Sequence, residues 1–203
     1  MTKVKLCGMF RVDDIAACNL LKPDYVGFIN LFPKSHRNID FQTAMMLRSM
    51  LDDSIPSVGV FVNREIKEIT PYTLANVVNA IQLHGQESND YIQQLRAVTP
   101  SYVPIIKAFK IRSEDDLKEA EKSLADYVLL DNGTGTGETF DWNLIRNFPR
   151  PYFLAGGLGP ENLAGAIERF HPYAVDISSG IETNKVKDPD KMEQCVKIVR
   201  SFD

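Results

Sequence analysis

The chain has 203 residues, of which 23 are Lys or Arg and 27 are Asp or Glu, so that its formal net charge is −4. No basic run or stripe supplies the footprint that a nucleic-acid backbone needs, which argues against a nucleic-acid partner. No apolar run approaches the ~18 to 20 residues of a membrane span, and the first residues enter a strand without room for a signal peptide. We therefore expect a cytoplasmic protein that contacts neither nucleic acid nor membrane.

Short apolar runs and amphipathic runs alternate from one end of the chain to the other. The apolar runs, each expected to form a strand, are Val4–Cys7, Asp24–Ile29, Pro56–Val62, Val78–Leu83, Pro104–Phe109, Tyr127–Leu130, Tyr152–Ala155 and Tyr173–Ile177. The amphipathic runs, each expected to form a helix, are Val12–Leu21, Phe41–Leu51, Arg64–Leu74, Asn89–Val98, Ser113–Leu124, Trp142–Asn147, a run that begins at Pro160–Asn162, and Pro189–Arg200. Apolar strands without strict polar alternation are typical of parallel strands buried on both faces.

This order predicts an α/β protein with a single domain over residues 1–203. A closed (β/α)8 barrel, the TIM barrel, is the architecture that it favours. An open doubly wound sheet is the alternative, but such a sheet usually has fewer strands and a glycine-rich fingerprint after the first. No linker or shift in composition divides the chain. Because no exposed apolar stripe stands out, we expect a monomer.

The three cysteines, Cys7, Cys18 and Cys195, have neither CxxC spacing nor an even count. A disulfide framework or a zinc site is therefore not expected. Cys18 and Cys195 lie in helical patterns, where a thiol behaves as a small apolar group. Cys7 differs because it ends a strand and precedes a glycine.

The carboxyl ends of TIM-barrel strands face one opening, where active sites are found. Cys7 ends the first expected strand and Asp131 follows the sixth, so a thiol and a carboxylate can face each other across that opening. Taken alone, Asp131 in Asp-Asn-Gly could cap a turn, and a lone cysteine could be an inert strand residue. The glycines at 133, 135 and 137 would let the backbone fold tightly beside the carboxylate.

Two glycine-bearing loops follow the seventh and eighth expected strands. The first contains Gly156 and Gly157, and the second contains Ser178, Ser179 and Gly180. Loops in these positions commonly bind phosphate through backbone N–H groups. A tight turn is the alternative for the two adjacent glycines. A Walker loop is excluded because no Gly-Lys-Ser/Thr follows them, and the glycine run at 133–137 does not fit a dinucleotide fingerprint.

Several motifs, in order along the whole chain, resemble those of the phosphoribosylanthranilate isomerase family. They are KLCG at 5–8, GF at 27–28 with SHR at 35–37, VGVFVN at 58–63, QLHG at 82–85, GTGETFDW at 135–142, LAGGLGPEN at 154–162 and DISSGIE at 176–182. The resemblance implies a TIM barrel of the ribulose-phosphate-binding type. It also implies the third step of tryptophan biosynthesis, the Amadori rearrangement of N-(5-phosphoribosyl)anthranilate into 1-(2-carboxyphenylamino)-1-deoxy-D-ribulose 5-phosphate.

By the same resemblance, Asp131 is the general acid that protonates the furanose ring oxygen. Cys7 is then the general base that takes the C2′ proton. Arg37 is expected to bind the anthranilate carboxylate, for which a guanidinium supplies paired hydrogen bonds. Neither a metal nor an organic cofactor is implied, and the expected partner is the small-molecule substrate.

The other expected substrate contacts come from three strand ends. Gln82 and His84 belong to the QLHG motif, and for His84 a positioning or structural role is favoured over that of a catalytic base. Asp176 is expected to order the phosphate loop or to reach the sugar. The phosphate contacts are expected from the two glycine-bearing loops, at Gly156, Gly157, Ser178, Ser179 and Gly180.

Two other functions stay open on the sequence. One is a sister barrel of tryptophan or histidine biosynthesis. Indole-glycerol-phosphate synthase would need a lysine acid and a longer N-terminus, and the histidine-pathway isomerase would have an aspartate at the position of Cys7. The other is a catalytically silent barrel that binds a sugar phosphate, against which the presence of both an acid and a base argues.

Overall fold

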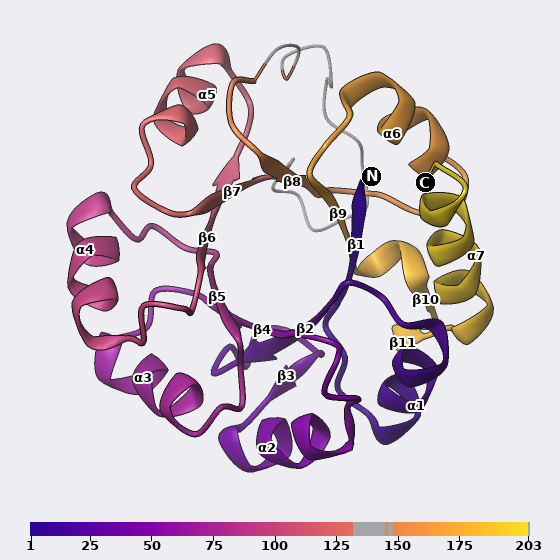
Figure 1. The fold of residues 1–203 in the computed structure, drawn as a ribbon, viewed down its shortest axis with the longest axis horizontal. Coiled ribbons are helices and arrows are strands. Elements are labelled where there is room, and N and C mark those ends of the chain that lie inside the picture. Colours follow the sequence, from indigo (N-terminus) through magenta and orange to yellow (C-terminus); the bar gives the residue numbers. More distant parts are fainter. Residues whose placement is uncertain (132–144, 146–147, 203) are drawn as a thin grey trace.

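The computed structural model describes residues 1–131, 145 and 148–202 of the chain. In this part of the protein, parallel strands form a closed inner ring and helices form an outer ring around it (Figure 1). The ring strands are β1 (Lys3–Cys7), β2 (Tyr25–Asn30), β4 (Ser57–Phe61), β5 (Ala80–Leu83), β6 (Ile105–Lys110), β7 (Tyr127–Asp131), β8 (Tyr152–Leu154) and β9 (Ala174–Ile177). Because β1 pairs with both β2 and β9, the ring is closed, which confirms the TIM barrel over the open sheet.

Helices follow the ring strands, and three of them are preceded by a side chain that caps their first turn. The helices are α1 (Val12–Leu21), α2 (Phe41–Met50), α3 (Ile66–Leu74), α4 (Asn89–Val98), α5 (Glu114–Glu121), α6 (Leu163–Phe170) and α7 (Pro189–Arg200). Asp40, Ser88 and Ser113 accept hydrogen bonds from backbone N–H groups in the first turns of α2, α4 and α5. Such caps satisfy donors that the helix itself leaves unpaired.

Several helix boundaries differ from the prediction, and one expected helix falls outside the described residues. Helix α5 ends at Glu121 rather than Leu124. Helix α6 begins at Leu163 because the Asn162 side chain bonds the preceding loop, accepting from the Gly159 N–H at 2.9 Å and donating to the Gly157 carbonyl at 2.8 Å. The expected helix over 142–147 lies outside the described residues except for residue 145.

Short elements follow two of the ring strands. The strand β3 (Asn38–Ile39) lies beside β2. After β9 come a 3₁₀ turn, η2 (Ser179–Ile181), and an antiparallel hairpin of β10 (Glu182–Thr183) and β11 (Val186–Lys187). These additions lie next to the carboxyl ends of β2 and β9, where the carboxylate and phosphate contacts are expected.

Alternation along β1 divides its side chains between two environments. Val4 and Leu6 belong to the core between the strands and the helices. Lys3, Lys5 and Cys7 occupy the opposite face, which is the inside of the ring. The rest of the ring interior is filled mainly by apolar side chains, namely Val58, Ala80, Ile106, Ala108, Leu129, Phe153, Ala155 and Ala174.

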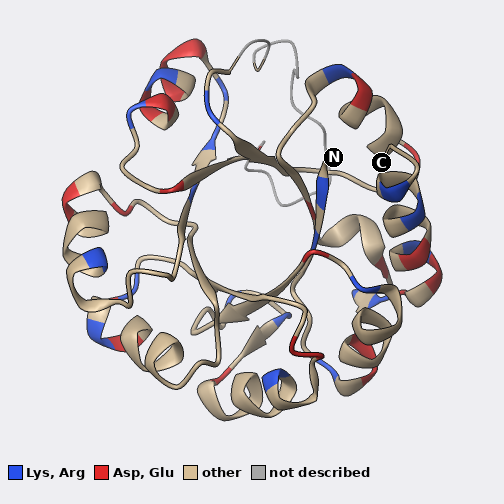
Figure 2. Cartoon of the chain, in the orientation of Figure 1, with Lys and Arg blue, Asp and Glu red and all other residues tan. Residues whose placement is uncertain are grey.

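Charged residues of both signs are interspersed over the outer ring of helices (Figure 2). Among the described residues, no helix is both long enough and apolar enough to span a membrane.

Candidate active site

The carboxyl ends of the ring strands surround a cavity of about 620 Å³. Its walls contain all but one of the predicted site residues, namely Cys7, Arg37, Gln82, His84, Asp131, Gly156, Gly157, Asp176, Ser178 and Ser179. They come from segments spread over the whole chain, which ring closure brings to one opening. A second hollow, of about 780 Å³, lies on the flank beside α4, β6 and α5 and contains none of these residues.

Cys7 lies in the wall of the cavity at the end of β1 and is 5% exposed. A Cβ atom at Gly27 would lie 2.6 Å from its Sγ, so the thiol requires a glycine on the neighbouring strand β2. Burial raises the pKa of the Cys7 thiol and the carboxylate of Asp176 raises it further, while the cations of Lys5 and Lys187 offset only part of this. Cys7 is therefore a neutral thiol in the free protein near neutral pH.

Asp176 is paired with a lysine that the sequence analysis did not single out. Lys5 is fully buried, and its Nζ donates to both carboxylate oxygens of Asp176 at 2.9 Å. Burial alone lowers the pKa of Lys5, but its interactions with the carboxylate of Asp176 and with the Cys7 side chain outweigh burial, and the pKa is raised. Strand alternation was the available signal, because residues two apart on β1 share a face with Cys7.

Two side chains at the end of β5, Gln82 and His84, connect to Asp131 through hydrogen bonds. His84 Nε2 lies 3.3 Å from Asp131 Oδ2, and His84 Nδ1 lies 2.9 Å from Gln82 Nε2. Since an amide nitrogen can only donate, this orientation makes His84 Nδ1 an acceptor and assigns the ring proton to Nε2, which donates to Asp131. The arrangement fits a positioning role for His84.

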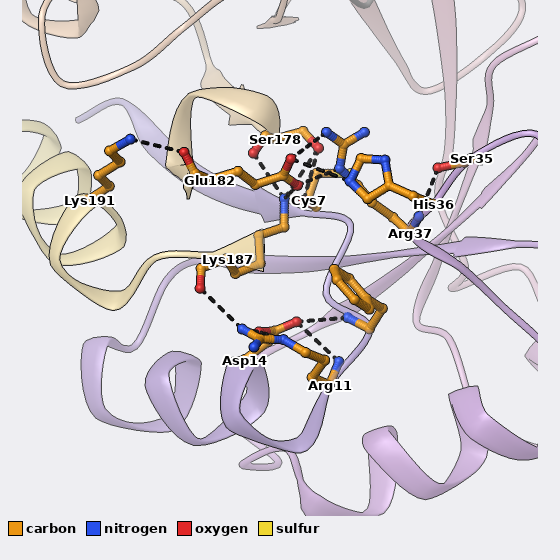
Figure 3. Close-up of polar contacts among 11 residues, drawn as sticks. Cys7, Arg11, Asp14, Ser35, His36, Arg37, Ser178, Glu182, Lys187 and Lys191 are labelled. Carbon is orange, nitrogen blue, oxygen red and sulfur yellow. Dashed lines mark hydrogen bonds and ion pairs between the residues drawn. The ribbon is translucent and has the colours of Figure 1, made fainter. Parts of the chain in front are cut away.

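Arg37 is held by a carboxylate that the sequence analysis also missed. Its Nε and Nη2 donate to the two oxygens of Glu182 at 2.5 and 2.7 Å. Figure 3 shows Glu182 between Arg37 and Lys187, whose Nζ lies 2.8 Å from Glu182 Oε1. Lys187 is buried and also donates to the Ser178 carbonyl at 2.9 Å. Glu182 ends the DISSGIE motif, and that was the signal which could have pointed to it.

The charge of Glu182 is stabilised by its two cations. Burial alone raises its pKa, but the hydrogen bond from Arg37 and the positive charge of Lys187 outweigh it and lower the pKa to about 2. Glu182 is therefore a carboxylate near neutral pH. It joins the loop after β2 to the hairpin after β9 at one edge of the cavity.

The two glycine-bearing loops meet at another part of the wall. Gly156 and Gly157 have φ of 95° and 65°, a conformation that favours glycine. Gly180 does not line the cavity: a Cβ atom there would collide with the Leu158 carbonyl, and glycine thus lets the loops after β8 and β9 touch. Ser178 Oγ donates to the Cys7 carbonyl at 3.1 Å, which ties the second loop to β1.

Two further observations concern the extent of the site. The GTGETFDW motif at 135–142 lies outside the described residues. In the part of the chain that the structure describes, no group of three or more His, Cys, Asp or Glu side chains is placed to hold a metal ion.

Comparison with known proteins identifies relatives of the chain. The family model described as N-(5′-phosphoribosyl)anthranilate (PRA) isomerase matches residues 4–198. The N-(5′-phosphoribosyl)anthranilate isomerase of Endomicrobium trichonymphae is 44% identical over 207 residues, which cover 100% of both chains.

Solved structures give the same result. The phosphoribosyl anthranilate isomerase of Thermotoga maritima is 34% identical, with a TM-score of 0.87 over 99% of this chain and 100% of that one. A phosphoribosyl anthranilate isomerase in complex with reduced 1-(o-carboxyphenylamino)-1-deoxyribulose 5-phosphate is also 34% identical, with a TM-score of 0.85 over 99% of this chain and 100% of that one.

Proposed function

Because the chain belongs to the N-(5′-phosphoribosyl)anthranilate isomerase family, we propose that Cys7 and Asp131 are the base and the acid of its reaction. The chain is an isomerase of tryptophan biosynthesis that converts N-(5-phosphoribosyl)anthranilate into 1-(2-carboxyphenylamino)-1-deoxy-D-ribulose 5-phosphate. The observation that carries the proposal is the shared cavity, which has a thiol from β1 and a carboxylate from β7 in its wall. General acid–base chemistry on a sugar requires one group of each kind within reach of the substrate.

Asp131 starts the reaction by giving its proton to the furanose ring oxygen, so that the ring opens to an iminium ion. His84, which donates to Asp131 Oδ2, fixes the direction of this carboxyl group and is itself fixed by Gln82. Gln82 is buried in the cavity wall, and its Oε1 has no hydrogen-bond partner among the described residues. We assign that oxygen to a substrate hydroxyl, because a buried acceptor left unpaired is costly.

Cys7 completes the reaction by taking the C2′ proton of the iminium ion, which gives an enolamine that tautomerises to the ketone. A thiolate is the form that accepts a proton, and the iminium ion is the form from which the C2′ proton is most readily lost. The neutral thiol of the free protein must therefore ionise before or during substrate binding.

Arg37 is the proposed ligand of the anthranilate carboxylate. The side of the guanidinium that carries Nε and Nη2 is occupied by Glu182, which leaves the side that carries Nη1 for a second carboxylate. A planar fork that is already oriented loses little freedom when it binds. Glu182 thus holds Arg37 in a direction that the substrate can use.

The substrate phosphate is proposed to lie between the loops after β8 and β9, close to Gly157 and Ser179. Both residues line the cavity, and the loops bring backbone amides toward the same region. Asp176 holds Lys5, which donates to both of its oxygens. Because each carboxylate oxygen can accept more than one hydrogen bond, Asp176 can also reach the sugar from its place in the cavity wall.

Two experiments test these assignments. Loss of phosphoribosylanthranilate fluorescence on adding the protein measures the reaction, and no loss at high protein concentration would indicate a barrel that only binds a sugar phosphate. A crystal structure with reduced 1-(o-carboxyphenylamino)-1-deoxyribulose 5-phosphate locates the phosphate. A phosphate found away from Gly157 and Ser179 would contradict the proposed site.

We also propose that the protein acts as a monomer in the cytoplasm. Large exposed apolar side chains are spread over several helices of the outer ring, with Leu20 on α1, Met45, Met46 and Met50 on α2, Leu74 on α3 and Val98 on α4. Light scattering during size exclusion should give a mass near 22.9 kDa. A mass of twice that value would show a dimer.

A further inference from the structure

Lys5 carries a buried charge, and the proposed steps of the reaction assign it no role. Its side chain is fully buried inside the ring, two residues before Cys7 on the same face of β1. A charged ammonium without contact with water is costly unless it is paired, so Lys5 must have partners that account for its burial. Those partners are Asp176 and Cys7.

The three groups form one cluster. Lys5 Nζ donates to both oxygens of Asp176 at 2.9 Å, and its charge lowers the pKa of the Cys7 thiol. A Cβ atom built on Gly27 would lie 2.6 Å from Cys7 Sγ and 3.2 Å from Lys5 Nζ, so the thiol and the ammonium share the space above that glycine. Two of the three ammonium protons are thus directed to Asp176, and the third is available to the sulfur.

Other charged groups face Cys7 from the neighbouring elements. Lys187, on β11, lies beside the thiol but is held by Glu182 at 2.8 Å and by the Ser178 carbonyl at 2.9 Å. Arg37 lies on the far side of Glu182 and is bound to it. Asp131, with His84, belongs to the wall of the same cavity. Of the two lysines, Lys5 lowers the pKa of the Cys7 thiol more than Lys187 does, and its Nζ shares the space above Gly27 with the sulfur.

We propose that Lys5 is the positioning residue that makes Cys7 usable as a base, with its ammonium paired to the thiolate and held beneath the sulfur by Asp176. The proposal rests on the assignment of Cys7 as the base. The thiol releases its proton to water through the cavity, and the resulting thiolate is neutralised by the ammonium. When the thiolate takes the C2′ proton it becomes a neutral thiol again, and the Lys5–Asp176 pair is the same before and after.

The pair should act on Cys7 with opposite signs. Lys5→Met removes the cation and leaves the carboxylate, so the thiolate becomes harder to form. Asp176→Asn removes the anion and leaves the ammonium to the sulfur, so the thiolate becomes easier to form. A structural role alone would not produce shifts in opposite directions.

Alkylation of the folded protein by iodoacetamide measures this directly, because only the thiolate reacts. Modification at Cys7 is followed by mass spectrometry across pH, with the fully buried Cys18 and Cys195 as internal references for unfolding. Lys5→Met should react at least about tenfold more slowly at pH 8, which corresponds to one pKa unit. Asp176→Asn should react faster than the wild type at the same pH. In Lys5→Met, kcat should fall much more than KM changes, and part of the loss should be recovered at higher pH.

Lys107→Met is the matched control. Lys107 is also a buried lysine on a ring strand, but its Nζ pairs with Glu87 at 3.2 Å on the flank beside α4. Its removal should leave the pH profile of Cys7 alkylation unchanged. If Lys5→Met does not fold, the Lys5→Met/Asp176→Asn double variant replaces it and is compared with Asp176→Asn. The apparent pKa of the Cys7 thiol should then be higher in the double variant than in Asp176→Asn.

The outcomes separate this inference from the assignment of the base. A wild-type alkylation profile in Lys5→Met, or shifts of the same sign in the two single variants, would overturn the role of Lys5. Wild-type turnover in Cys7→Ala would instead overturn the assignment of Cys7, whatever the alkylation profile shows.

Discussion

Two lysines of β1, Lys3 and Lys5, lie inside the ring, and their partners at its two ends are of different kinds. Lys3, at the end away from the cavity, donates to the hydroxyl of Tyr173 at 2.9 Å and lies 4.9 Å from the centre of that ring and 5.6 Å from that of Tyr25. Lys5, nearer the cavity, is paired with the carboxylate of Asp176.

The partners of Lys3 are neutral phenols that fill the end of the ring. Tyr127 stacks on Tyr173 with ring centres 4.8 Å apart, and the hydroxyls of Tyr25 and Tyr173 are 3.1 Å apart. The hydrogen bond with Tyr173 raises the pKa of Lys3, although partial burial opposes it. Aromatic groups that both pack and hydrogen-bond close this end without buried ion pairs.

The cavity end instead holds carboxylates and cations in pairs, Lys5 with Asp176 and Glu182 with both Arg37 and Lys187. Such pairs are weak evidence for stability, because desolvation offsets much of their attraction. Their charges shift the pKa of the neighbouring Cys7 thiol, and Glu182 orients Arg37. The comparison suggests that the phenol end serves stability and the charged end serves the reaction.

Removing the acid or the base should give the largest effect on the reaction. We expect Cys7→Ala and Asp131→Asn each to reduce kcat by about 10²- to 10⁴-fold, the range attributed to a positioned acid or base. Steady-state assays measure the loss, and circular dichroism should show an unchanged fold. Turnover close to that of the wild type in either variant would contradict the assignment at that residue.

Removing the arginine should weaken binding more than chemistry. Arg37→Met deletes hydrogen bonds to a charged group, worth ~1.5–3 kcal/mol, so KM should rise about tenfold to a hundredfold with a smaller change in kcat. Glu182→Gln should raise KM less, because Arg37 remains but loses its orientation. The exposed Arg112, replaced by Met, is the matched control and should leave KM unchanged. An equal fall in kcat in Arg37→Met would argue against a role in ground-state binding.

Acid should remove the contribution of Glu182 to stability. The pKa of this carboxyl is lowered in the folded protein from 4.5 to about 2, so its stabilising contribution is complete above the unfolded value and is lost as the pH falls toward 2. Urea unfolding of the wild type and Glu182→Gln should therefore differ most above about pH 5.5 and progressively less between about pH 4.5 and 2. If the difference in unfolding free energy between the two proteins stays constant over this pH range, the ion pairs of Glu182 do not account for its contribution to stability.

Changing the phenol end should give the smallest effect, and on stability alone. Tyr173→Phe removes the hydroxyl that accepts from Lys3, at a cost of about 1 kcal/mol. For a chain of this size the midpoint of thermal unfolding should fall by about 2–4 °C. We expect kcat and KM to be those of the wild type. A loss of turnover without a loss of stability would mean that the two ends are not separate in function.

The sequence by itself determined the barrel and placed the two groups proposed as acid and base at its opening. Hydrophobic runs are a local property, so the expected strands agree with the ring strands, and a parallel ring places residues at strand ends, such as Cys7 and Asp131, around one opening. The motifs also predicted the family correctly. Helix ends were less predictable, because the loop contacts of Asn162, rather than helix propensity, decide where α6 begins.

Only the tertiary structure decided which charges pair. Lys5 and Asp176 are 171 residues apart, and they meet because β9 closes the ring against β1. Arg37 and Glu182, 145 residues apart, meet for the same reason at the rim. Burial makes these pairings matter for the pKa of the groups involved, because a charged group that has lost contact with water is stabilised mainly by its nearest partner. No local pattern in the chain encodes that partner.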